Sequence, residues 1–250
     1  MNFDEQIARI QAAASNPRQL ALAVLDIVLS SKPPELRRVL DAAAVLRWFD
    51  ERSLAVVLDP DLRGRTADWV EMLKSLNAVE LASGRQGWNV HETTRRALRE
   101  QLQAENPNRM AELAGRACDA FRGPGVSERI EYAYHLVLTN PAGCGPVIRA
   151  LNFDLQANPE QALAFAGALG EYLTHDVWPA GTRGWAAYFA AANREHYRPI
   201  HETLQAAQNS LASFEACALE EGIACACDQL GDAHYERGLP GDTAQASGYY

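Results

Sequence analysis

Hydrophobic and polar residues alternate with a period of two in two short stretches near the middle of the chain. Val79 and Leu81 have polar neighbours, and so do Trp88 and Val90. This alternation is typical of half-buried strands. Between them, residues 83–87 (Ser-Gly-Arg-Gln-Gly) are turn formers, so the segment is predicted to be a β-hairpin.

The hydrophobic period then changes, which predicts a helix directly after the hairpin. Ala97 and Leu98 recur at helical spacing with the apolar residues around them. Arg95, Arg96 and Arg99 fall off that face and are expected to be solvated.

Three further helices are predicted just upstream. Pro33 opens the first, and Asp50 can cap a short second helix that Asp59-Pro60 ends. Thr66 can cap the third, and Asn77 is expected to end it in a left-handed conformation. Three helices, a hairpin and a helix over residues 33–105 are the element order of a winged helix. The inner positions expected for the three helices are Leu36, Val39, Leu40, Ala43, Leu54, Val57, Leu58, Trp69, Val70, Leu73 and Leu76.

Helical patterns fill the rest of the chain. An N-terminal helical segment is expected over residues 1–32, with Leu20, Val24, Ile27 and Val28 forming a packing face on its second helix. A helical connector is expected over residues 106–158, and antiparallel helices over residues 159–250. The helices expected after the winged helix cover residues 109–122, 130–139, 160–173, 182–196, 199–219 and 221–237.

The last stretch carries a repeat signal. Its Leu-Gly pair, aromatic, glycine turn, small residue and aromatic resemble a tetratricopeptide unit. The chain ends within the second helix of this unit, which would leave an apolar edge for further chain or a partner to cover. The predicted fold class is therefore mainly α, a winged helix with a small β-hairpin followed by a tetratricopeptide-like helical superhelix. The residues that carry the signal are Leu230, Gly231, Tyr235, Gly238, Ala246, Tyr249 and Tyr250.

Composition places the chain among ordinary globular proteins of 250 residues. No stretch approaches the ~20 apolar residues of a membrane span, and the N-terminus lacks the basic region of a secretory signal, so the cytoplasm is the expected location. The net charge of −9 is uneven, because the residues from Glu160 onward hold four arginines against a dozen acidic residues. Such an acidic half repels phosphate backbones and favours protein partners.

The five cysteines are irregularly spaced, which argues against a disulfide framework. Cys225 and Cys227 lie near Cys217 and His234, but two thiols two residues apart on a helix point in different directions. Buried core cysteines are the simpler interpretation, and no metal is predicted.

The outward positions of the third helix disfavour DNA recognition. Asp68 and Glu71 stand there with Lys74, and the tip of the wing offers only Arg85. Productive docking needs several basic side chains on one face. A DNA-binding regulator with a helical sensor domain remains the alternative function.

Residues 36–102, and above all 89–95 (Asn-Val-His-Glu-Thr-Thr-Arg), resemble the winged-helix module of STAND-type signalling NTPases. The second strand of that family's hairpin ends in a Met-His-Asp-like motif, which Val90-His91-Glu92 resembles. The resemblance implies that His91 would contact the β-phosphate of ADP, provided that an NTPase core is supplied elsewhere. Residues 129–138 are similar to the first repeat helices of bacterial members.

The phosphate loop Gly-x-x-x-x-Gly-Lys-Ser/Thr is missing, and neither Lys32 nor Lys74 sits in a glycine-rich turn. One imidazole contact cannot offset the cost of immobilising a nucleotide, so no cofactor is predicted for this chain alone. The other interpretation of His91 is a helix-start residue packed beside the wing.

Catalysis has no recognisable sequence signature. His175-Asp176 lacks a nucleophile elbow, and His196 and His201 straddle Pro199 and make poor metal ligands. Glu131 and Glu220-Glu221 are expected on solvated faces. The candidates for a ligand or peptide groove, or otherwise for core, are the aromatic residues Trp178, Trp185, Tyr188, Phe189 and Tyr197.

The sequence thus predicts a non-enzymatic regulatory or scaffolding piece of a STAND-like signalling protein, in which the winged helix couples to a helical-repeat sensor. Its partner would be a protein, such as an NTPase domain or an effector. Nucleic acid and membrane are disfavoured as partners. A small-molecule sensor in the aromatic zone is the third hypothesis.

Overall fold

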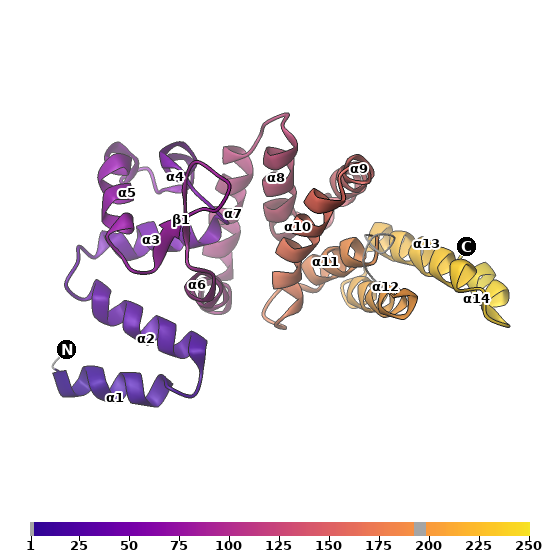
Figure 1. Cartoon of the computed structure of the whole chain (residues 1–250), viewed down its shortest axis with the longest axis horizontal. Helices are drawn as coiled ribbons and strands as arrows, with labels where there is room; N and C mark the ends of the chain where they lie inside the picture. The colour runs from indigo at the N-terminus through magenta and orange to yellow at the C-terminus, as the bar shows by residue number, and fades with distance from the viewer. Residues whose placement is uncertain (1–2, 193–198) are drawn as a thin grey trace. The chain divides into compact units, whose positions relative to one another are not determined.

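The computed structural model describes residues 3–192 and 199–250 (Figure 1). That part of the chain is mainly helical, with one two-stranded antiparallel sheet. It divides into two compact units, Met1–Arg122 and Gly123–Tyr250. The first unit contains α1 (Phe3–Ala13), α2 (Pro17–Leu29), α3 (Glu35–Val45), α4 (Glu51–Val57), η1 (Arg63–Arg65), α5 (Thr66–Lys74), β1 (Val79–Leu81), β2 (Trp88–Val90), α6 (Glu92–Glu105) and α7 (Pro107–Ala120). The second contains α8 (Val126–Thr139), α9 (Gly145–Leu155), α10 (Pro159–Leu169), η2 (Gly170–Leu173), α11 (Ala180–Ala192), α12 (Ile200–Glu215), α13 (Glu220–Arg237) and α14 (Asp242–Tyr249).

The predicted β-hairpin is confirmed. In its antiparallel register Leu81 faces Trp88, and Gly84 in the connecting turn takes a left-handed φ of 70°. The hairpin also pairs with a third segment that the sequence did not reveal. Phe49, just before α4, forms an isolated antiparallel bridge with Trp88 of β2. The Phe49 N–H donates to the Trp88 carbonyl at 2.7 Å, and the Trp88 N–H donates back at 2.8 Å.

The helices before the hairpin bury the faces that the periodicity predicts. Leu36 and Leu40 are fully buried on α3, and Leu54 and Leu73 on α4 and α5. Asp50 caps α4 as expected, since its side chain accepts a hydrogen bond from the Ser53 N–H at 2.7 Å.

Two helix-end predictions are wrong. Thr66 is the first residue of α5 and not its cap, because its hydroxyl donates to the Arg63 carbonyl at 2.7 Å in the preceding 3-10 turn. Asn77 does not adopt the left-handed conformation. Among the non-glycine residues of the described ranges, Ala218 alone has a positive φ. Helix α5 ends at Lys74, and its C-cap Ser75 has an ordinary right-handed helical conformation.

The solvated face expected for Arg95 and Arg99 on α6 is also wrong, since they are only 5% and 1% exposed. An amphipathic stripe predicts that a helix buries one face only. Helix α6 packs against α2, α3 and α7, so that more of its surface is buried than the stripe predicts.

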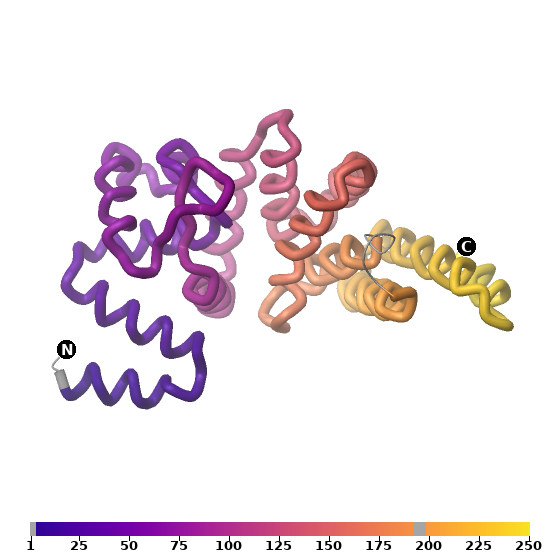
Figure 2. Tube along the Cα trace, viewed as in Figure 1, coloured from indigo at the N-terminus to yellow at the C-terminus, as the bar shows by residue number. Residues whose placement is uncertain are grey.

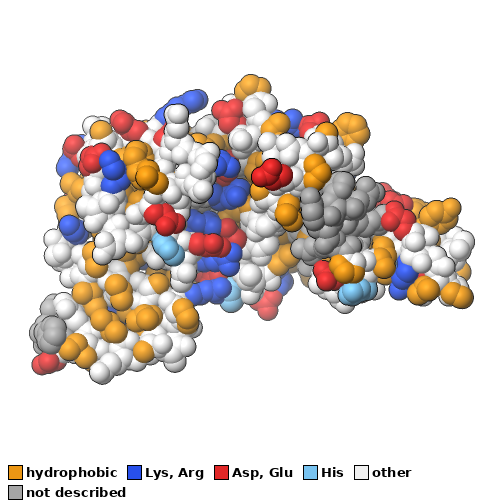
Figure 3. All heavy atoms as spheres, viewed as in Figure 1, with side chains coloured by type: hydrophobic (Ala, Val, Ile, Leu, Met, Phe, Trp, Pro, Cys, Tyr) orange, Lys and Arg blue, Asp and Glu red, His pale blue; other side chains and the backbone are white. Residues whose placement is uncertain are grey.

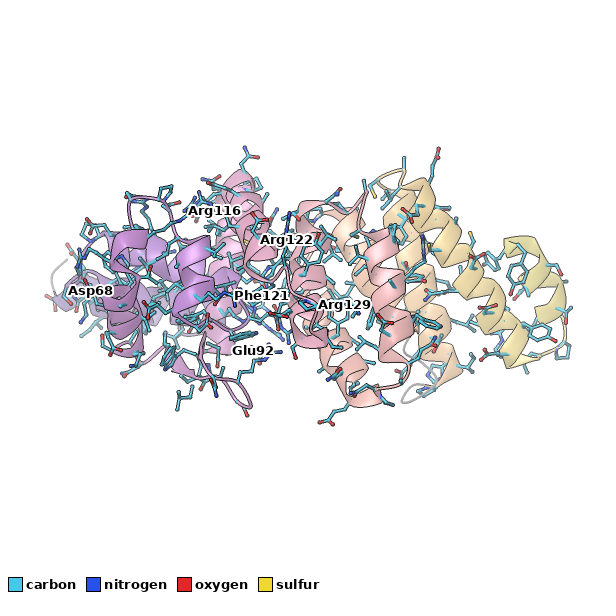
Figure 4. The ribbon with its side chains drawn as sticks, turned by 90° about the horizontal axis from the view of Figure 1, so that it is seen from above. Asp68, Glu92, Arg116, Phe121, Arg122 and Arg129 are labelled. Atoms are coloured by element: carbon cyan, nitrogen blue, oxygen red, sulfur yellow. The ribbon has the colours of Figure 1, made fainter. Side chains whose placement is uncertain are left out.

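Ion pairs fix α7 to the first unit. Asp59 accepts hydrogen bonds from Arg109 at 2.7 Å and from Arg116 at 2.8 Å, both on α7, and from Arg38 of α3 at 2.6 Å. Arg116 also donates to the Val57 carbonyl at 3.1 Å. In Figure 4, Arg116 is labelled on this helix. The stretch 106–158, expected as one connector, is therefore shared between the units, with α7 in the first and α8 and α9 in the second.

Helices α11 to α14 of the second unit pack against their neighbours in order. Phe214 of α12 is fully buried, and its ring lies where a Cβ on Gly184 of α11 or on Gly222 of α13 would come within 2.5 Å. The turn from α13 to α14 uses two left-handed glycines, Gly238 and Gly241.

Glu131 was expected on a solvated face, and this prediction is wrong. It is fully buried on α8, one turn before the equally buried His135. Burial there follows from helices on more than one side, since α8 packs against α9, α10 and α11.

Candidate functional site

His91, the residue singled out by the sequence, occupies the N-cap position of α6 immediately after β2. Its backbone N–H donates to the Ala78 carbonyl at 2.7 Å, which continues the hairpin ladder by one residue. The side chain is exposed and makes no capping hydrogen bond. The imidazole is therefore free to meet a ligand or a partner, while the backbone fixes its position beside the hairpin.

The His91 side chain lines a cavity of about 470 Å³ in the first unit. Helix α2 forms one wall of this cavity, and the turn between α5 and β1 forms the opposite wall. Figure 2 shows α1 and α2 as an antiparallel hairpin, so that α1 supports α2. The full lining consists of Pro17, Leu20, Ala21, Val24, Leu25, Val28, Lys32, Ser75, Leu76, Asn77, Ala78, His91 and Thr94.

Part of the packing face expected on α2 is therefore an open wall. Val24 and Val28 are 44% and 40% exposed, whereas Leu25 is buried. The sequence predicts the apolar stripe, but only the tertiary structure shows that Val24 and Val28 within it stay partly exposed.

The aromatic zone lies in the core of the second unit. Trp185 and Phe189 are fully buried, and Trp178 and Tyr188 nearly so. The Trp185 indole N–H donates to the Pro141 carbonyl at 2.7 Å. These four side chains therefore give no support to the groove hypothesis and fit the core interpretation, while Tyr197 lies outside the described residues.

Ring contacts hold this aromatic core together. Trp185 packs edge-on against Tyr188 and Phe214, with centroids 5.5 and 4.9 Å apart. Phe165 and Phe189 meet at 4.6 Å. Perpendicular ring pairs of this kind add to the energy of apolar burial.

The polar residues considered for catalysis do not converge. Asp176 is exposed and pairs with Arg183, and His201 is exposed on α12. His196 lies outside the described residues. Across residues 3–192 and 199–250, no three His, Cys, Asp or Glu side chains gather where they could hold a metal ion.

A second hollow, of about 570 Å³, lies at the N-terminus of α5. Arg52, Arg63 and Arg65 line it together with Glu51 and Asp68. Much of its positive charge is already committed, because Arg65 pairs with Asp68 at 3.2 Å and Arg63 donates to the Leu58 carbonyl at 3.0 Å.

No helix within the described ranges has both the length and the apolar character needed to cross a membrane. Comparisons of this chain with protein-family models, with curated proteins and with solved structures found no match.

Proposed function

We propose that this chain is a non-enzymatic regulatory module that acts by binding another protein. In this proposal residues 33–105 form a winged helix like that of STAND-type signalling NTPases, and residues 159–250 form a tetratricopeptide-like helical region that senses or scaffolds. The partner is an NTPase domain or an effector in the cytoplasm.

The observation that carries the proposal is the element order from α3 to α6 together with the position of His91. Three helices, the β1–β2 hairpin and α6 follow one another in the first unit, and His91 stands exposed at the junction of β2 and α6. In the family that these residues resemble, the histidine at this position contacts the β-phosphate of ADP that is bound to the NTPase core. The packing of each helix from α11 to α14 on the next supports the repeat part of the proposal.

A direct test uses ADP and the partner separately. We expect calorimetry to show no micromolar ADP affinity for the chain alone, because one imidazole contact is too weak to hold the ligand. Affinity purification from the native extract, followed by mass spectrometry, should recover a protein with a nucleotide-binding domain.

The matched variants are His91→Ala and Thr93→Ala, which change neighbouring exposed residues. If His91 contacts the phosphate of a partner-bound nucleotide, His91→Ala should weaken the ADP-dependent complex roughly 10- to 100-fold, as expected for a hydrogen bond to a charged group. Thr93→Ala should leave it unchanged. The proposal would be contradicted if the purification recovered no nucleotide-binding protein, or if both variants bound the partner equally well in the presence of ADP.

The hollow at the N-terminus of α5 favours a second candidate, a DNA-binding regulator, because three arginines meet a helix start there. The exposed charges further along α5 oppose it, since Glu71 pairs with Lys74 at 2.7 Å and leaves no excess of base. A gel shift at low salt distinguishes the two. The second candidate would be favoured if the wild type bound duplex DNA at micromolar protein concentration, if salt weakened this binding, and if Arg52→Glu abolished it.

A further inference from the structure

We propose that the cavity between α2 and the α5–β1 turn binds a long-chain aliphatic carboxylate, with its alkyl chain along α2 and its carboxylate at Lys32. This inference goes beyond the proposed function and does not depend on it.

The shape of the cavity suits an elongated ligand. The lining positions on α2 recur every three or four residues from Pro17 to Val28, which is one continuous stripe along the whole helix. A helix of this length extends roughly 20 Å at about 1.5 Å per residue. The volume of about 470 Å³ falls within the range of small-molecule sites, about 300–1,000 Å³.

The α2 wall is apolar, whereas Ser75, Asn77 and Thr94 add polar groups to the rest of the lining. Val24 and Val28 are partly exposed to the hollow, while the buried Leu25 and Leu76 belong to the same lining. Figure 3 shows hydrophobic side chains gathered over the α1–α2 hairpin. An alkyl chain placed there would remove this apolar surface from water, which favours binding.

The charge around the cavity favours an anion. The lining contains Lys32 and His91 but no Asp or Glu. The one carboxylate of α2, Asp26, is engaged elsewhere, by an ion pair with Arg9 and by Arg37 at 2.9 Å.

Lys32 is available to such a ligand. It follows the C-terminal end of α2, just beyond Val28 at the end of the apolar stripe. Hydroxyls of Ser30 and Ser31 already donate to the last carbonyls of the helix, at 2.7 and 3.1 Å. Within the described chain the Lys32 ammonium has no hydrogen-bonding or ion-pair partner. The carboxylate of a ligand could therefore pair with it.

Other occupants fit less well. A protein partner of standard size buries about 800 Å² on each side, whereas the exposed apolar surface here lines a hollow. A membrane surface attracts clusters of several basic residues, and Lys32 is the single Lys or Arg in this lining. A free amphiphile with one negative charge matches both the volume and the charge.

The test titrates the whole chain with palmitate by calorimetry, at a concentration below micelle formation. We expect saturable one-to-one binding. Val24→Asp, which sets a charge in the apolar wall, should weaken it about tenfold or more. Lys32→Gln should weaken palmitate about tenfold while leaving the methyl ester of palmitate unaffected, because the ester carries no charge to pair.

The matched control is Leu163→Asp, a half-exposed apolar residue on α10 of the second unit, which should bind palmitate as the wild type does. Unchanged melting temperatures show that the variants fold. Three results would overturn the proposal: palmitate binding equal in Val24→Asp and the wild type, binding to phosphatidylcholine–phosphatidylserine vesicles but not to free palmitate, or a wild-type dimer that Val24→Asp dissociates. Equal loss of acid and ester in Lys32→Gln would remove the assigned role of the ammonium.

Discussion

At the scale of single residues, Asp59 connects several charged groups of the first unit. Its carboxylate is nearly buried, and it accepts hydrogen bonds from guanidinium groups of Arg38, Arg109 and Arg116. Burial acts to raise the pKa of Asp59, but the hydrogen bonds from these arginines outweigh it and hold the pKa well below the usual range. Asp59 therefore joins α3 and α7 through one anion.

We expect Asp59→Asn to reduce the free energy of unfolding by roughly 2 to 3 kcal/mol. Losing one partner of a buried pair costs about 3 to 5 kcal/mol, and the partly exposed arginines recover some hydration. Urea denaturation measures this loss. Asp119→Asn is the control, because Asp119 pairs with Arg122 on the surface at 3.1 Å, and its effect should stay within about 0.5 kcal/mol.

The lowered pKa of Asp59 also predicts how stability depends on pH. The unfolded carboxyl titrates near 3.9, so its stabilising contribution is fully present above that pH and declines as the pH falls toward the lower native pKa. The difference in unfolding free energy between wild type and Asp59→Asn should thus be constant from pH 5 to 7, as follows from that titration range, and should shrink below pH 4. An equal difference at every pH would contradict the ionised pairing.

At the scale of secondary-structure elements, helix spacing in the second unit depends on two glycines. Gly184 on α11 and Gly222 on α13 leave room for the buried ring of Phe214 on α12. Glycine within a helix costs up to about 1 kcal/mol relative to alanine, so its presence here is explained by the close approach of the ring.

We expect Gly184→Ala to destabilise the chain by roughly 1 to 2 kcal/mol. Overpacking costs about 1 to 3 kcal/mol, and the better helix propensity of alanine returns up to about 1. Gly167→Ala on α10 is the matched control, because a Cβ there meets no atom within 4 Å. It should be stabilising. In a Phe214→Leu background the Gly184→Ala penalty should shrink, since the clash is with the ring.

Helix α9 shows why element prediction failed between α8 and α10. The residues around its start, Gly143, Cys144 and Gly145-Pro146, are of types common in turns. In the structure Pro146 stands in the first turn of α9, where a missing N–H costs nothing. The buried Ile148 and Leu151 then hold this helix in the core.

At the scale of the whole molecule, the net charge belongs to one unit. Residues 1–122 contain 17 basic and 17 acidic residues, whereas residues 123–250 contain 6 and 15. The second unit therefore accounts for the whole net charge of −9 and repels polyanions. The first unit has no net charge and contains the hairpin and the cavity beside α2.

Two cores in one chain predict departures from two-state unfolding. Calorimetry should resolve two transitions, with Asp59→Asn lowering one and Gly184→Ala lowering the other. A single transition shifted equally by both substitutions would show that the units unfold as one cooperative body.

The sequence by itself determined the helical character, the β1–β2 hairpin and the buried stripes of α3, α4 and α5. Local periodicity, turn residues and caps such as Asp50 encode these features in neighbouring positions. It also placed His91 at the start of the helix after the hairpin, where the structure has it. The tertiary structure alone decided that Arg99 and Glu131 are buried, that the aromatic zone is core and that the α2 stripe lines a cavity. Each of these depends on which other elements cover a given face, and contacts between distant segments leave no periodic signal in the sequence.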